Sequence, residues 1–540
     1  MKNKDYERFG VMLDMSRNGV MKVSEVKRMI DALEKMGYNC LELYTEDTYE
    51  IEGEPYFGYL RGRYTGAELK EIDAYAKAHG IELIPCVQTL AHFTALVRHP
   101  AYRDIVDTND ILLIDEPKTY ELIDKIFATL AENFTSRLVN IGMDEAHMVG
   151  LGAYLDKHGY QDRHELLLKH LNKVAEIAKK YGFKAHMWSD MFFRLANHGS
   201  YYVDKAMQFP KEIASKVPEN VELVYWDYYN MEEITFDVQL QSHKSLCENI
   251  WFAGGAWTWN GFAPLNWYSL QTMKPAMKSV ANNGVKNVLI TMWGDNGREC
   301  SPFAVLPSLY AIRQYALGNF DEEKIAKGFS RLFKISYEDF ILLDLPNRAE
   351  TPLLNSAGKE FPQCPCKSLL YADPFMGMFD KTVMNVRPIP YARYAVELRK
   401  AAKRAGEYAY LFESMEKLCL VLAVKAELGV RTRRAYQGRD MKAILSLVKE
   451  YAALEKRLAA FHSAFYNLWN KECKPQGWEV QDARLGGLIQ RVKTCRERLS
   501  LYAKGKLVVI EELEEEILPY SPQNYFQFNS YAQTITMSVF

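Results

Sequence analysis

Residues 9–44 read FGVMLDMSRNGVMKVSEVKRMIDALEKMGYNCLELY and hold two short apolar runs on either side of an amphipathic stretch. The runs Phe9–Met15 and Asn39–Tyr44 do not alternate with polar residues, which is typical of strands buried on both faces of a sheet. Between them, Val23–Met36 carries apolar residues at three- and four-residue spacing, which predicts a helix. Two such strands joined by a helix indicate a unit of a parallel sheet.

The same order of strand and helix recurs along residues 8–318. Six further strands are predicted, at Glu82–Gln88, Leu138–Met143, Lys184–Ser189, Glu222–Trp226, Ile250–Ala256 and Asn287–Met292. Eight strand-then-helix units are typical of a (β/α)8 or TIM barrel, an α/β fold. An open, doubly wound sheet is the alternative, but no Gly-x-Gly-x-x-Gly turn follows the first strand. The sequence therefore favours the barrel.

The character of the sequence changes after residue 318. Residues 345–390 are rich in proline and glycine and show little periodicity. Farther on, helix patterns dominate, at Ala392–Leu411, Met415–Tyr436, Met441–Leu468 and Val480–Ala503. We predict a catalytic barrel at 1–318, a linker or wrapping segment at 319–390 and a mainly α-helical C-terminal domain at 391–540.

The composition excludes several classes of function. Lys+Arg 67 against Asp+Glu 69 gives a formal net charge of -2, so no nucleic-acid partner is expected. The sequence has no run of about 18 apolar residues, so we expect no membrane span. The polar start at Met1–Tyr6 lacks the apolar core of a signal peptide. The nine cysteines are scattered, which favours free thiols in a reducing cytoplasm. We expect no metal and no cofactor, because no cysteine or histidine spacing completes a ligand set.

Tryptophan is concentrated in one part of the chain. Seven of the nine lie between Trp188 and Trp293, and four of these end consecutive predicted strands: Trp188, Trp226, Trp257 and Trp293. The carboxyl ends of barrel strands carry the active site, so these indoles would line one pocket. Aromatic faces with interspersed carboxylates suit a sugar, because its C–H faces stack on rings and its hydroxyls donate to carboxylates.

The adjacent carboxylates Asp144 and Glu145 follow the fourth predicted strand. Two neighbouring carboxylates repel each other, which raises the proton affinity of at least one of them. A carboxyl group that stays protonated near neutral pH is what a general acid for a glycosidic oxygen requires. The string Asp144–His147, DEAH, also occurs in helicases, but the chain has no phosphate-binding Gly-x-x-x-x-Gly-Lys-[Ser/Thr] loop and no basic excess. Catalysis at the strand end is the favoured interpretation.

Over about residues 8–318 the sequence resembles glycoside hydrolase family 20, the β-N-acetylhexosaminidases. The resemblance rests on Asp14-x-x-Arg17 after the first strand and on Gly142-x-Asp144-Glu145 after the fourth. It rests also on Trp293-Gly294-Asp295, where the family commonly has Trp-Gly-Glu. The helical C-terminal region, with no N-terminal α/β domain, looks like the intracellular bacterial branch of that family.

This resemblance implies an exo-β-N-acetylhexosaminidase that removes terminal non-reducing β-linked GlcNAc with retention, GalNAc being left open. It implies substrate-assisted catalysis, in which the 2-acetamido oxygen attacks the anomeric carbon and an oxazolinium ion forms. By the same resemblance, Glu145 protonates the leaving oxygen and then activates water, while Asp144 orients the acetamide nitrogen. Residues that match the family's substrate contacts are Arg17 for sugar hydroxyls 3 and 4, Asp14 in the same motif as a further substrate-binding residue, Asp295 for hydroxyls 4 and 6, Trp188, Trp226 and Trp293 for the acetamide box, and Trp257 as a further wall.

Two positions depart from the family pattern. After the seventh strand the family often has Tyr-x-Asp, with the tyrosine donating to the acetamide carbonyl, but Thr258-Trp259-Asn260 stands here. We expect Tyr228 to supply that hydroxyl, with Tyr229 as second choice. After the third strand Gln88–His92 replaces an Asp-Met-Pro-Gly-His pattern, and His92 still occupies the histidine position, where it could support the two carboxylates.

Other functions stay open at this point. The alternatives are a catalytically inactive amino-sugar-binding barrel and a barrel glycosidase of another specificity with two distant carboxylates. The expected partners are GlcNAc-terminated oligosaccharides or glycoconjugates, with neither nucleic acid nor membrane. The helical domain offers a surface for a homodimer, although the sequence leaves the oligomeric state, the linkage and the aglycone open.

Overall fold

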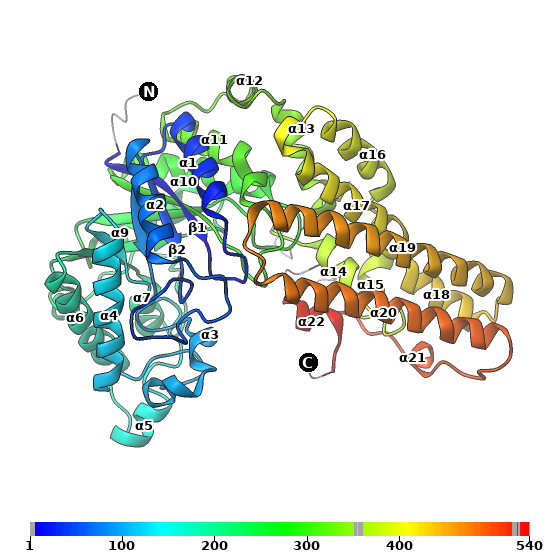
Figure 1. The fold of residues 1–540 in the computed structure, drawn as a ribbon, viewed down its shortest axis with the longest axis horizontal. Helices are drawn as coiled ribbons and strands as arrows, with labels where there is room; N and C mark the ends of the chain where they lie inside the picture. Colours follow the sequence, from blue (N-terminus) through cyan, green and yellow to red (C-terminus); the bar gives the residue numbers. More distant parts are fainter. Residues whose placement is uncertain (1–5, 350–353, 355–359, 521–525, 527–529, 539–540) are drawn as a thin grey trace. The chain divides into compact units, whose positions relative to one another are not determined.

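The computed structural model describes residues 6–349, 354, 360–520, 526 and 530–538. The chain forms two compact units (Figure 1). The first unit consists of Met1–Ala256, Ser269–Trp293 and Leu309–Phe320, and the second of Trp257–Tyr268, Gly294–Ser308 and Asp321–Phe540. The segments that follow the seventh and eighth strands, 257–268 and 294–308, are therefore grouped with the second unit.

The first unit is built on a closed barrel of eight parallel strands in chain order. The strands are β1 Arg8–Asp14, β2 Cys40–Tyr44, β3 Glu82–Cys86, β4 Leu138–Asn140, β5 Lys184–Trp188, β6 Val221–Trp226, β7 Ile250–Gly255 and β8 Asn287–Met292. The barrel closes where β1 pairs with β8, with Phe9 opposite Val288 and Val11 opposite Ile290. The predicted (β/α)8 barrel is confirmed.

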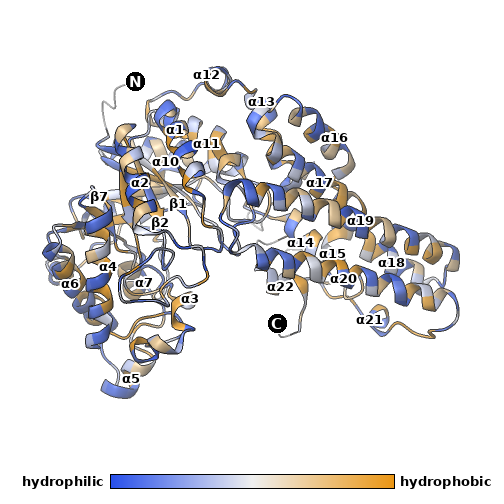
Figure 2. Ribbon diagram, in the orientation of Figure 1, coloured by the Kyte–Doolittle hydropathy of each residue, from blue (hydrophilic) through white to orange (hydrophobic). Residues whose placement is uncertain are grey.

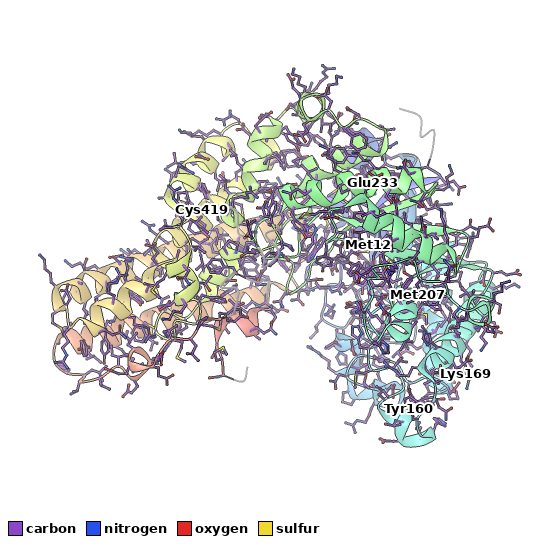
Figure 3. The ribbon with its side chains drawn as sticks, turned by 180° about the vertical axis from the view of Figure 1, so that it is seen from behind. Met12, Tyr160, Lys169, Met207, Glu233 and Cys419 are labelled. Carbon is purple, nitrogen blue, oxygen red and sulfur yellow. The ribbon has the colours of Figure 1, made fainter. Side chains whose placement is uncertain are left out.

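The strands are apolar because both of their faces are buried, one inside the barrel and one under helices. All side chains of β2, β7 and β8 are buried, as are those of β1 after Arg8. Met12, in the middle of β1, lies inside this unit, whereas Lys169 of α6 is exposed on its outside (Figure 3). A polar exception inside the barrel is Glu42, whose Oε1 lies 2.6 Å from His186 Nε2, so the buried carboxylate has a partner.

Helices connect the strands and cover the barrel. They are α1 Val23–Met36, α2 Gly66–Ala78, α3 Thr94–Val97, η1 Pro100–Ile105, α4 Pro117–Asn133, α5 Ala153–His158, α6 Arg163–Lys180, α7 Asp190–Ala196, α8 Lys211–Ala214, α9 Glu233–Lys244, α10 Asn266–Asn282 and α11 Leu306–Ala316. Local sequence sets their ends, as at α2, where Thr65 and Glu68 form a reciprocal capping box. At the other end of α1, Gly37 adopts φ 83° and stops the helix.

The second unit is helical. Its elements are η2 Pro302–Val305, α12 Glu322–Phe333, α13 Tyr337–Ile341, η3 Leu342–Asn347, α14 Pro365–Tyr371, α15 Asp380–Asn385, α16 Tyr391–Ala402, η4 Gly406–Tyr408, α17 Ala409–Lys425, α18 Leu428–Gln437, α19 Met441–Glu472, α20 Trp478–Ala503, α21 Glu511–Glu514 and α22 Tyr531–Ile535. The long helices α19 and α20 lie side by side (Figure 1). Figure 2 shows hydrophobic and hydrophilic residues alternating along both, as expected of helices with one buried face. The predicted mainly helical C-terminal region is confirmed.

Several elements end elsewhere than the sequence predicts. Strand β4 stops at Asn140, not at Met143, because the backbone at Gly142 and Met143 has positive φ and leaves the sheet. The predicted helix 392–411 is two helices separated by residues 403–408, and 415–436 spans parts of α17 and α18. The expected linker, 319–390, contains short helices, and its residues 350–353 and 355–359 lie outside the described residues. In the described part of the chain no helix is long and apolar enough to cross a membrane.

Candidate active site

The turn after β4 carries both candidate catalytic carboxylates on a strained backbone. Gly142, Met143 and Glu145 have φ of 70°, 69° and 52°, in a region that costs free energy for residues other than glycine. A side chain at position 142 is excluded as well, because a Cβ there would lie 2.1 Å from Gln88 Oε1. The structure thus presses the turn against the side chain of Gln88 on the neighbouring strand end.

Hydrogen bonds from three strand ends hold this turn. Asn140 Oδ1 accepts from the Gly142 N–H at 3.0 Å, and Gln88 Oε1 accepts from the Met143 N–H at 3.1 Å. Asp190 Oδ2, at the start of α7, accepts from the Glu145 N–H at 3.1 Å. Buried hydrogen bonds of this kind hold a backbone in one conformation and offset the free energy of its strain. The two carboxylates are therefore fixed in place.

Asp144 is a buried carboxylate with two donors. It is only 8% exposed, and it accepts from Gln88 Nε2 at 2.8 Å and from His92 Nε2 at 3.1 Å. Burial raises the pKa of Asp144, but the charge of His92 and the hydrogen bonds from His92 and Gln88 outweigh burial, and the pKa is lowered. Burial alone would lower the pKa of His92, yet Asp144 raises it to about 9. At neutral pH the pair is an aspartate and an imidazolium.

Glu145 has a different environment from its neighbour. Its side chain is 44% exposed, and its carboxylate is 3.9 Å from His92 Nε2 on one side and 3.9 Å from Arg194 Nη2 on the other. The buried, ionised Asp144 is suited to stabilising positive charge, whereas the accessible Glu145 can exchange protons with a ligand or water. Two adjacent carboxylates with unlike surroundings can thus take two roles.

Arg17 follows the end of β1 and is held by acidic and aromatic side chains. Its Nη1 lies 3.1 Å from Asp14 Oδ2 and its Nη2 lies 3.6 Å from Glu46 Oε1. The guanidinium also lies over two rings, 4.8 Å from the centroid of Tyr44 and 5.0 Å from that of Trp293. Charge pairs and cation–π contacts hold the side chain from several directions, which suits a residue that presents donors to hydroxyls.

Aromatic rings from β5, β6 and β8 form a continuous wall. Trp188 and Trp293 have centroids 5.9 Å apart, and Trp293 Nε1 donates to Tyr228 Oη at 3.1 Å. Tyr228 in turn stacks on Trp226 at 5.3 Å. Tyr228 is 6% exposed, and burial raises its pKa well above the usual range, so the hydroxyl keeps its proton.

Contacts link these groups without a break. The chain of contacts runs from the wall through Arg17 to Glu46, whose Oε1 accepts from Tyr44 Oη at 3.1 Å. Gln88 Nε2 donates to Tyr44 Oη at 3.0 Å and, as described, to Asp144. The structure therefore brings together these sequence-predicted residues of the first unit: Asp14, Arg17, His92, Asp144, Glu145, Trp188, Trp226, Tyr228 and Trp293.

Residues 6–279 match the catalytic domain of glycosyl hydrolase family 20, and residues 338–532 match the glycoside hydrolase 20C C-terminal domain. The chain belongs to glycoside hydrolase family 20. Relatives of this chain include human hexosaminidase D, 25% identical over 57% of this chain and 65% of the human protein. A β-hexosaminidase of Vibrio furnissii is 27% identical over 36% of this chain and 39% of that protein.

Among solved structures, a GH20 exo-β-N-acetylglucosaminidase of Vibrio harveyi in complex with N-acetylglucosamine aligns with a TM-score of 0.47 and 17% identity. It covers 63% of this chain and 58% of that chain. As for the two curated relatives above, the alignment spans less than two thirds of the human protein and of the Vibrio furnissii protein.

Two predicted family-20 site residues fall in the segments grouped with the second unit. Trp257 is fully buried and stacks on Trp259 at 4.1 Å, with Tyr268 edge-on at 5.0 Å. Asp295 is exposed in the segment that follows β8. Both ring partners of Trp257 belong to the second unit, and the roles of Trp257 and Asp295 toward a sugar remain predictions.

The family-20 site also uses residues that sequence reasoning did not select. Tyr44 ends β2, and Glu46 and Gln88 follow the ends of β2 and β3, so the rule that barrel strand ends carry the site could have found them. Asp190 is the first residue of α7, after the N-cap Ser189, and its carboxylate accepts from the Glu145 backbone N–H. In the described residues no group of three or more His, Cys, Asp or Glu could hold a metal ion.

Proposed function

We propose that this chain is an exo-β-N-acetylhexosaminidase that hydrolyses terminal non-reducing β-linked GlcNAc by substrate-assisted catalysis. The observation that carries the proposal is the pair of unlike carboxylates in a family-20 barrel. Asp144 is buried and held ionised by His92 and Gln88, while the neighbouring Glu145 is accessible. The matched relatives named hexosaminidase D and β-hexosaminidase support the same assignment.

In this mechanism the nucleophile is the carbonyl oxygen of the substrate's own 2-acetamido group. Its attack on the anomeric carbon forms a bond from oxygen to carbon and breaks the bond to the leaving oxygen, to which Glu145 gives its proton. Positive charge develops on the acetamide nitrogen, and the ionised Asp144 beside it accepts the N–H and stabilises that charge. Glu145 then removes a proton from the water that opens the oxazolinium ion, which restores the β configuration.

Holding the acetamide is as important in this scheme as moving the proton. An internal nucleophile in the right orientation can be worth roughly 7–11 kcal/mol, against about 3–5 kcal/mol for general acid–base assistance. The wall of Trp188, Trp226 and Trp293 supplies flat surfaces for the acetamide, and Tyr228, which lies within that wall, supplies a hydroxyl for its carbonyl. Arg17 would hold the sugar hydroxyls, and for Asp295 and Trp257 the proposed sugar contacts rest on the family resemblance alone.

We extend the proposal to the organisation and location of the chain. We keep the order of a catalytic barrel at 1–318 and a helical domain at 391–540, and we note that the C-terminal family match begins at 338, inside the proposed connecting segment 319–390. A reducing, cytoplasmic location fits the nine cysteines, all of which are free thiols.

A turnover assay with an aryl N-acetyl-β-glucosaminide tests the proposed function. We expect hydrolysis with release of the β-anomer first, and competitive inhibition by a thiazoline that mimics the oxazolinium ion. Binding of GlcNAc without turnover would instead identify an inactive sugar-binding barrel. Turnover that ignores the thiazoline would identify a glycosidase of another mechanism.

A further inference from the structure

Asp190 and Arg194 lie one helical turn apart on α7 and face the general acid. Asp190 Oδ2 accepts from Arg194 Nε at 2.9 Å and also from the Glu145 N–H at 3.1 Å. Arg194 Nη2 lies 3.9 Å from Glu145 Oε1. One aspartate oxygen therefore holds both the backbone of Glu145 and the arginine that faces its carboxylate.

Arg194 is itself held in this position. Its Nη1 donates to the Gly199 carbonyl at 3.3 Å, and its guanidinium lies 5.8 Å from the ring centroid of Tyr201. The second oxygen of Asp190, Oδ1, is buried and has no hydrogen-bond partner among the described residues. Arg194 is thus a positive charge held in a fixed position, and the buried carboxylate of Asp190 is hydrogen-bonded to it.

The remaining charged groups around Glu145 come from the β3 and β4 segments. His92 Nε2 lies 3.9 Å from Glu145 Oε2, and Asp144 precedes it in the chain. His147, two residues farther on, senses the charges of Glu145, Arg194, His92 and Arg163, and burial and Arg194 lower its pKa. Cationic or protonatable groups thus lie near Glu145 from several sides, with Asp144 and Asp190 as acidic neighbours.

We propose that Asp190 and Arg194 are a charge-balancing pair of positioning residues that sets the pH range over which Glu145 keeps the proton it must donate. The proposal rests on the proposed function, since it concerns Glu145 as general acid. Arg194 by itself would favour the ionised form of Glu145 and make it a poor acid at neutral pH. The carboxylate of Asp190, hydrogen-bonded to Arg194, offsets that charge and lets Glu145 retain its proton.

The surroundings of Asp190 place this balance in the useful pH range. Burial, with the nearby charges of Asp144 and Glu145, raises the pKa of Asp190 to about 7 in spite of Arg194. Asp190 therefore gains its negative charge as the pH rises through neutrality. The added negative charge lies on the residue that holds both the guanidinium of Arg194 and the backbone of Glu145.

Single substitutions separate the charge of the pair from its hydrogen bonds. Asp190→Asn keeps an oxygen acceptor for the Glu145 N–H but removes the charge, so the alkaline limb of kcat/KM should move to lower pH by about 0.5–1 unit. Arg194→Gln removes the opposing charge, so the limb should move to higher pH. In the double variant D190N/R194Q the limb should return toward that of the wild type. The matched control is Arg8→Gln, which removes an arginine paired with Glu82 at the opposite end of the strands and should leave the limb unchanged.

The decisive experiment measures pH profiles on an aryl N-acetyl-β-glucosaminide together with the pH midpoint of carbodiimide labelling of Glu145, read by peptide mass spectrometry. Opposite shifts in the two single variants, seen in both readouts, are the expected result. Unchanged or same-direction shifts in folded variants overturn the charge-balancing pair. Opposite labelling shifts in the two single variants, together with no turnover by the wild type, would overturn the proposed function and leave the pair standing.

Discussion

His92 Nε2 lies 3.1 Å from Asp144 Oδ2, so a cation faces the buried carboxylate at the mouth of the barrel. Each group stabilises the charged form of the other, which raises the pKa of His92 to about 9 and lowers that of Asp144. This relationship explains how Asp144 stays ionised while it is almost completely buried.

Removal of His92 should therefore change how activity depends on pH. In His92→Gln the pKa of Asp144 rises, because the cation is lost and burial remains. Since Asp144 acts as the anion, the acidic limb of kcat/KM should move to higher pH by about one unit or more. A profile that keeps the wild-type acidic limb would contradict this role for His92.

The same pair should contribute to stability in a defined pH window. The folded pKa of His92 is about 9, against about 6.5 in the unfolded chain, so its contribution is complete below pH 6.5 and lost as the pH rises through 9. We expect the free energy of unfolding of the wild type to fall by up to about 3 kcal/mol more than that of His92→Gln across this window. Urea unfolding at several pH values measures the difference, and parallel curves for the two proteins would refute it.

Gly142 should tolerate no side chain. Gly142→Ala would meet both a positive φ of 70° and Gln88 Oε1 at 2.1 Å, so we expect a loss of at least about 3 kcal/mol in stability, with loss of activity. Gly80 is the matched control, because its φ is 68° and a Cβ there meets nothing within 4 Å. Gly80→Ala should cost only about 1 kcal/mol, and equal losses in both variants would show that contact with Gln88 is unimportant.

Tyr228 and Tyr229 should differ in their effect on turnover. Tyr228 is 6% exposed and joins the aromatic wall, whereas Tyr229 is 38% exposed. Tyr228→Phe should lower kcat on an acetamido substrate about tenfold, as expected for loss of one hydrogen bond that forms in the transition state. Tyr229→Phe should stay close to the wild type. The reverse order of effects would assign the acetamide contact to Tyr229.

Neutralising Glu145 or Asp144 should reduce turnover with a different dependence on the leaving group. Glu145→Gln should reduce turnover by about 10²–10⁴-fold on substrates with poor leaving groups and much less on those with good ones, because its proton is then not needed. Asp144→Asn should lower turnover by a similar factor on both, because it stabilises the oxazolinium ion whatever the leaving group. Full activity in both variants, measured across a leaving-group series, would exclude the assigned roles.

Much of the fold could be predicted because it depends on local patterns. The eight apolar runs and the helices between them define a barrel in chain order, and the rule for strand ends then selects Asp14, Asp144 and Trp188. The turn after β4 could not be predicted, because its positive φ values depend on contacts with Gln88 and Asp190 from other strand ends. Composition gives no sign of such contacts.

The apolar pattern of the sequence also did not predict where some helices end or which compact unit some segments belong to. Apolar spacing continues through residues 403–408, where the structure separates α16 from α17. The segments that hold Trp257 and Asp295 are grouped with the helical unit, although they follow β7 and β8 in the sequence. The homodimer and the intracellular bacterial branch remain predictions from the sequence.

The central claim is that the substrate's own acetamide is the nucleophile. A panel of aryl β-glycosides that are matched in leaving group and differ only in the 2-acetamido group tests it most directly. We predict that kcat/KM falls by several orders of magnitude when the acetamide is replaced by a hydroxyl, because the internal nucleophile is lost. Equal rates on the two classes of substrate would contradict the account.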